Sequence, residues 1–196
     1  MRYNHLVALA AAATALCLAA PVSIAQVTVT TSSGEVVTMT QKNVVNHMVV
    51  FDSLNLEMAK LAVARTENVA VKDFAKQIVA DNTNHLEALN KLAHKRDIGR
   101  EVNLADTSSA DAIRDLDRMR SMAGDANFDK TFVREQILHI SRELDALAML
   151  RPAAKDDDLW KDIDRSAVPA LQRHLAQAKQ VGTTLGMNVE AIKPSR

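Results

Sequence analysis

The residues of this chain best suited to chemistry are histidines and carboxylates placed where helices should face one another. Five of them are candidate metal ligands: Glu57, His85, His139, Glu143 and His174. Imidazole and carboxylate groups on facing helices suit Fe, Mn, Zn or Cu, so a transition metal is the cofactor to expect if they converge. The alternative is a hydrogen-bonded polar layer without metal, in which His85 and His174 bond to Glu57 or Glu143. Both readings satisfy the same constraint, because a buried charge left unpaired costs several kcal/mol.

No motif for a specific reaction accompanies these residues. The sequence has no glycine-rich phosphate loop, no G-x-S-x-G and no C-x-x-C-H haem attachment. Haem held by a histidine and by Met58 or Met149 is conceivable, but a methionine at helical spacing more often fills a core. No catalytic residue is therefore predicted.

A repeat places two of the histidines at equivalent positions. Residues 71–86 read VKDFAKQIVADNTNHL and residues 160–175 read WKDIDRSAVPALQRHL, which align without a gap at a constant offset of 89 residues. The aligned pairs include His85 with His174 and Leu86 with Leu175. Self-similarity at a fixed offset is typical of a duplicated supersecondary unit. Two helical hairpins of this kind predict a four-helix bundle.

Caps and breakers predict where the helices lie. Four long helices are expected over about 40–66, 68–96, 127–151 and 156–182, with a short amphipathic crossover helix over 108–122. Asn68 and Asn127 are the expected N-caps of the second and third long helices. Pro152 should help to end the third, and Pro169 should kink the fourth.

Each long helix is expected to direct a polar side chain inward. The predicted buried face of the first helix is Val50, Leu54, Glu57, Leu61 and Ala64, with Glu57 at its centre. The third helix has a polar row of Gln136, His139 and Glu143, and His85 and His174 fall on the apolar faces of the second and fourth. His47 lies near a helix end and is expected to be solvated.

Residues 1–25 are expected to form an export signal. Residues 1–25 combine Arg2, an apolar run and Ser23-Ile24-Ala25, which predicts cleavage after Ala25 and a periplasmic or secreted protein. Cys17 is the only cysteine and would be removed, so the mature chain has no disulfide. Leu16 stands where a lipidation signal has a small residue, which disfavours a lipid anchor.

The rest of the chain divides into three parts. Residues 26–40 form either a small hairpin around Ser33-Gly34 or a mobile N-terminal segment. Residues 41–183 are expected to form the bundle, and residues 184–196 a C-terminal tail.

Charge excludes some partners. The chain has 24 basic and 24 acidic residues and no basic stripe interleaved with aromatics, which argues against nucleic-acid binding. No transmembrane segment is expected after signal cleavage.

Several short motifs resemble those of a known family. They are Glu57-x3-Leu61-Ala62, Val71-Lys72-Asp73-Phe74-Ala75, Ile78-Val79-x-Asp81, Phe128-Asp129, His139, and Val168-Pro169-Ala170-Leu171-x2-His174-Leu175. From Phe51 to Gly182 the chain resembles the bacterial secreted family called domain of unknown function 4142. The resemblance implies a ferritin-like four-helix bundle and assigns no activity. In that family Asp81 is commonly followed by histidine, and aspartate usually precedes the helix histidine; here these positions are Asn82 and Leu138.

The sequence therefore predicts an all-α, ferritin-like four-helix bundle built from two helical hairpins and a crossover helix, preceded by a cleaved signal peptide. The expected function is a non-catalytic envelope or stress-related protein that acts through binding or structure. The alternative is a metal-binding or metal-dependent redox protein that uses the interior histidines and carboxylates.

Overall fold

Five helices dominate the computed structural model, which describes residues 26–30, 36–98, 107–154 and 158–194. They are α1 Gln41–Arg65, α2 Val69–Lys95, α3 Thr107–Ser121, α4 Ala126–Ala154 and α5 Asp158–Thr184, and a short 3-10 helix η1 Val189–Ala191 follows. The predicted all-α bundle is confirmed. The predicted signal peptide at 1–25 lies outside the described residues.

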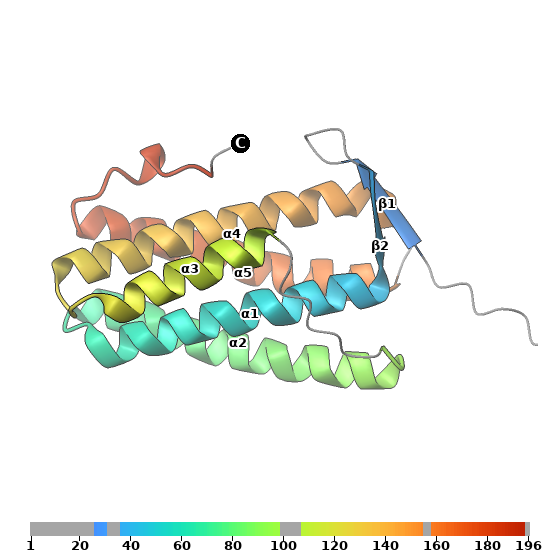
Figure 1. Ribbon diagram of the computed structural model, residues 1–196, viewed down its shortest axis with the longest axis horizontal. Helices are drawn as coiled ribbons and strands as arrows, with labels where there is room; N and C mark the ends of the chain where they lie inside the picture. The colour runs from blue at the N-terminus through green and yellow to red at the C-terminus, as the bar shows by residue number, and fades with distance from the viewer. Residues whose placement is uncertain (1–25, 31–35, 99–106, 155–157, 195–196) are drawn as a thin grey trace, which may run out of the picture.

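The four long helices form two hairpins that pack together (Figure 1). α1 lies against α2 and α4 lies against α5, while α2–α5 and α1–α4 contacts close the bundle. The crossover helix α3 lies along the outside of α1 and α4. This arrangement brings the side chains of α3 within reach of the α4 residues that face it.

The interior is apolar at both ends and polar in the middle. One apolar cluster includes Met58, Phe74 and Phe132, and a second includes Met48, Leu147 and Trp160. Buried polar side chains fall between the two clusters along the helices: Asp52, Asn55, Asn82, Gln136, His139, Glu143 and His174. The two clusters supply the hydrophobic stabilisation, and the polar layer between them must satisfy its own hydrogen bonds.

Local signals fixed most helix ends. The side chains of Thr40 and Asn68 each accept a hydrogen bond from the backbone N–H three residues later, so both are N-caps. The prediction that Asn68 caps the second long helix is therefore confirmed. The prediction for Asn127 was wrong: the Asp125 carboxylate accepts from the backbone N–H groups of Asn127 and Phe128 at 2.9 and 3.1 Å. Aspartate is as good a cap as asparagine, and its negative charge also suits the helix N-terminus.

Proline did not end α4. The helix continues through Pro152 to Ala154, and α5 contains Pro169 in its interior. Residues 26–40 include the hairpin that was one of two expectations: β1 Gln26–Thr30 pairs antiparallel with β2 Val36–Thr40, with Gln26 opposite Thr40. No helix in the described part of the chain is long and apolar enough to cross a membrane.

Arg65, at the end of α1, holds the end of α3. Its guanidinium donates to the backbone carbonyls of Met119 at 2.9 Å, Met122 at 2.5 Å and Arg120 at 2.7 Å. These carbonyls belong to the last turn of α3 and the residue after it, where a helix leaves acceptors without intrahelical partners. The contact fixes α3 against the bundle and thereby sets the position of the acidic side chains on α3.

The segment after α5 folds back onto the bundle. Val189 in η1 is buried, and Leu185, Met187 and Ile192 pack against the apolar cluster that contains Met58 and Phe132. Gly182 makes the approach possible, because a Cβ at this position would lie 2.6 Å from Val189 Cγ1 and 3.3 Å from Val133 Cγ1. Residues expected to form a tail thus include part of the core.

Candidate functional site

Four histidines each meet a carboxylate from another helix. The pairs are His47 Nε2–Glu143 Oε2 at 2.8 Å, His85 Nδ1–Asp52 Oδ2 at 2.6 Å, His139 Nε2–Asp115 Oδ2 at 3.1 Å and His174 Nε2–Asp81 Oδ2 at 2.7 Å. The imidazoles come from α1, α2, α4 and α5, and the carboxylates from α4, α1, α3 and α2. These contacts join helix to helix through the polar layer.

Glu57 does not face the interior, and that prediction was wrong. Its side chain is 49% exposed and forms an ion pair with Lys60 at 2.9 Å. α1 instead buries Asp52 and Asn55. Asp52 precedes Glu57 by five residues, which is about 140° around a helix, so the predicted face was rotated away from the true one.

The other four predicted ligands lie in the polar layer but pair separately. His139, Glu143 and His174 are buried and His85 is partly buried, as expected for inward-facing residues. The predicted partners of the repeat histidines were wrong, since His85 pairs with Asp52 and His174 with Asp81 rather than with Glu57 or Glu143. His47 was expected to be solvated, but its side chain is only 21% exposed and it pairs with Glu143.

The two repeat histidines share one small cavity. His85, His174, Asp52, Asp81 and Asn82 line it together with apolar residues, and its volume is about 20 Å³. That volume admits about one water molecule, which polar walls of this kind could bond. The equivalent histidines therefore meet in space, each with its own aspartate.

Burial and pairing perturb the titration of this cavity. Burial raises the pKa of Asp52, although the hydrogen bond and charge of His85 act in the opposite direction. Burial also opposes the charged form of His85, but the hydrogen bond and charge of Asp52 outweigh it and raise the pKa of that imidazole. At Asp81, burial is outweighed by hydrogen bonds from Gln77, His174 and Arg173, and the pKa of Asp81 is lowered.

A second cavity lies between α1, α3 and α4. Its volume is about 50 Å³, and His47, Asn55, His139 and Glu143 contribute the polar groups of its lining, along with Arg142. Glu143 Oε1 is buried and has no hydrogen-bond partner among the described residues. His139 lines this cavity and also contacts Asp115, so it connects the polar layer to the surface of α3.

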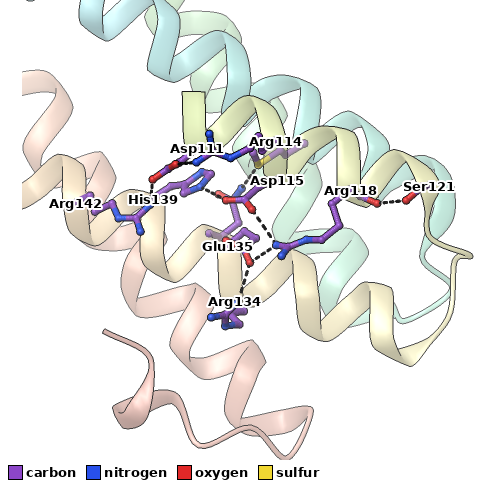
Figure 2. A network of polar contacts seen from close by, with 11 residues as sticks. Asp111, Arg114, Asp115, Arg118, Ser121, Arg134, Glu135, His139 and Arg142 are labelled. Carbon is purple, nitrogen blue, oxygen red and sulfur yellow. Dashed lines mark hydrogen bonds and ion pairs between the residues drawn. The ribbon is translucent and has the colours of Figure 1, made fainter. Parts of the chain in front are cut away.

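Among the described residues, three ligand-type side chains cluster where α3 meets α4, and His139 is one of them. Asp115, Glu135 and His139 each place one ligand atom within 4.8 Å of the other two (Figure 2). Asp115 comes from α3, and Glu135 and His139 lie one turn apart on α4. Glu135 and His139 are buried, whereas Asp115 is half-buried at the helix surface.

Arginines surround this group in Figure 2. Arg118 Nη2 lies 3.0 Å from Asp115 Oδ1 and 2.7 Å from Glu135 Oε1, and Arg134 Nη1 lies 3.1 Å from the same Glu135 oxygen. The hydrogen bond with His139 lowers the pKa of Asp115, whereas burial and the nearby charge of Asp115 raise the pKa of Glu135. The two carboxyl groups thus occupy unlike environments.

Sequence reasoning had part of this group. His139 was a predicted ligand, and its i, i+4 spacing from Glu135 places the two side chains on one helix face. Asp115 was missed because only the apolar residues of the crossover helix were assigned a direction. Its helix periodicity was the available signal, since Asp115 follows the buried Ala112 by three residues.

Comparison with known proteins identifies the family. The family model described as Domain of unknown function (DUF4142) matches residues 26–181. The chain belongs to this family. No curated protein and no solved structure matches the chain significantly. The amide of Asn82 donates a hydrogen bond to the backbone carbonyl of Asp52 at 3.4 Å.

Proposed function

We propose that this chain is an exported, non-catalytic protein of the cell envelope that acts through binding or structure, including under stress. The supporting observation is the pairing of His47, His85, His139 and His174 with carboxylates from other helices. Side chains held in interhelical hydrogen bonds serve the packing of the bundle, and any chemistry at them would require those contacts to break.

The test of this proposal has two parts. Export predicts that protein expressed in a Gram-negative host is recovered from the periplasm with Gln26 as its first residue, as N-terminal sequencing would show. A non-catalytic structural role predicts no stoichiometric metal after purification and an unchanged Tm in the presence of a chelator. Cytoplasmic recovery of an unprocessed chain would overturn the export half.

The second candidate function is metal binding, with or without redox chemistry. The observation in its favour is the convergence of Asp115, Glu135 and His139. Carboxylate oxygen and imidazole nitrogen together suit Mn, Fe and Zn. This candidate predicts stoichiometric metal by elemental analysis and a Tm that rises when the metal is added, because a ligand that binds only the folded state stabilises it.

A further inference from the structure

We infer that Asp115, Glu135 and His139 form a divalent transition-metal site in which the Arg118 guanidinium occupies the place of the cation and is exchanged for it. This inference rests on the second candidate function. It adds the ligand set and a residue that competes with the metal.

The ligand geometry is close to that of a shared ion. A metal held at about 2.0–2.2 Å by imidazole and carboxylate requires the two ligand atoms to lie roughly 3 Å apart. His139 Nε2 and Asp115 Oδ2 lie 3.1 Å apart. Glu135 completes the set, with one ligand atom within 4.8 Å of each of the others.

Of the two carboxylates, Arg134 contacts only Glu135, and it is Arg118 that supplies positive charge to both. One guanidinium nitrogen, Nη2, contacts both Asp115 and Glu135. Glu135 is 2% exposed, so its charge is costly to leave without a cationic partner. The Arg118 side chain is 49% exposed, so it can move into solvent when another cation takes its position.

Access to the group is open on the surface side. A hollow of about 190 Å³ between α3 and α4 is lined by Asp115, Glu135 and Arg118, together with Asp111, Arg114, Arg134, Leu138 and Arg142. Three protein ligands leave coordination positions for water, which this hollow can supply. The ion would join α3 to α4 directly, in place of the arginine contact.

The experiment compares metal binding by the purified wild-type protein with that of two arginine variants. Zn²⁺ binding is measured by calorimetry, and the ligand geometry is followed with Co²⁺ by its visible absorption. Arg118→Gln removes the competing charge. Arg120→Gln is the matched control, because Arg120 is also an exposed arginine of α3 but pairs with Asp117 and does not line the hollow.

We expect Arg118→Gln to bind one Zn²⁺ at least tenfold more tightly than the wild type, and Arg120→Gln to match the wild type. Adding His139→Gln to Arg118→Gln should abolish the gain and the Co²⁺ spectrum. Circular dichroism melting confirms that each variant is folded. If Arg118→Gln does not fold, Arg118→Lys is used instead; it keeps the charge but lacks the forked guanidinium donors, and its gain in Zn²⁺ affinity should be smaller.

The other outcomes distinguish the exchange of Arg118 for a metal from metal binding itself. Stoichiometric binding by the wild type with no gain in Arg118→Gln would overturn the exchange and leave the second candidate function standing. Binding that survives the His139→Gln change would overturn the ligand set. If neither the wild type nor Arg118→Gln binds Zn²⁺ or Co²⁺, the site and the second candidate function both fail.

Discussion

Asp52 on α1 and His85 on α2 form the shortest of the four interhelical histidine–carboxylate pairs, with 2.6 Å between Oδ2 and Nδ1. Asp52 is 3% exposed, and the His85 side chain is 18% exposed. The pair therefore fixes how the first helical hairpin is packed at the level of the polar layer.

Replacing Asp52 should destabilise the protein more than replacing Glu57. Asp52→Asn removes the charge that faces His85, and a hydrogen bond to a charged group contributes about 1.5–3 kcal/mol. Glu57 is exposed on the same helix, so Glu57→Gln should change the free energy of unfolding by less than about 0.5 kcal/mol. Urea denaturation of both variants measures the difference; equal effects would contradict the assignment of Asp52 to the interior.

The contribution of His85 should depend on pH. Its pKa is raised in the folded protein, so its stabilisation is complete below the ordinary histidine value of about 6.5 and is lost as pH rises through the folded-state value. The raised pKa of Asp52 acts in the same direction. The Tm difference between the wild type and His85→Gln should therefore be larger at about pH 6 than at about pH 9, by roughly 2–4 °C per kcal/mol lost. A difference that stays constant or grows with pH would show that the charged pair contributes nothing.

Gly182 should tolerate no larger residue while Val189 is present. An added Cβ would lie 2.6 Å from Val189 Cγ1, and overpacking of this kind costs about 1–3 kcal/mol. Gly182→Ala should lower the free energy of unfolding by that amount. Combining it with Val189→Ala should recover part of the loss, because the clashing methyl group is removed. Additive losses in the double variant would argue against the contact between α5 and η1.

Arg65 should control the stability of the end of α3. Arg65→Gln removes the guanidinium that donates to the carbonyls of Met119, Arg120 and Met122, at a cost of about 1–3 kcal/mol. Hydrogen exchange should speed up in α3 more than in α2. Lys60→Gln, a change to an exposed residue of the same helix, serves as the control. If hydrogen exchange in α3 is as slow in Arg65→Gln as in the wild type, the contacts of Arg65 are not needed to stabilise the end of α3.

The family and the order of the helices could be predicted from the sequence, because short motifs, N-cap residues and apolar periodicity determine them. The predicted ends of α1 agree with the observed helix: Thr40 and Thr66, at the expected limits, are its N-cap and C-cap, and Asn68 caps α2 as expected. His85 and His174 do lie on the apolar faces of α2 and α5, as predicted, since residues three and four apart on an amphipathic helix share a buried side. The face of α1 was harder to predict, because its apolar residues lie on more than one side, and the predicted face contained Glu57 where the structure buries Asp52.

The partners of the histidines were decided by the tertiary structure alone. The 89-residue repeat put His85 and His174 at equivalent positions, and the structure does bring them to one cavity. Their carboxylates are not equivalent, however: Asp52 lies on the neighbouring helix of the same hairpin, and Asp81 belongs to the other hairpin. A sequence period determines which side of a helix a residue occupies. Which carboxylate it meets depends on how helices are rotated and spaced against one another, and here that also brought Asp115 of the crossover helix to His139.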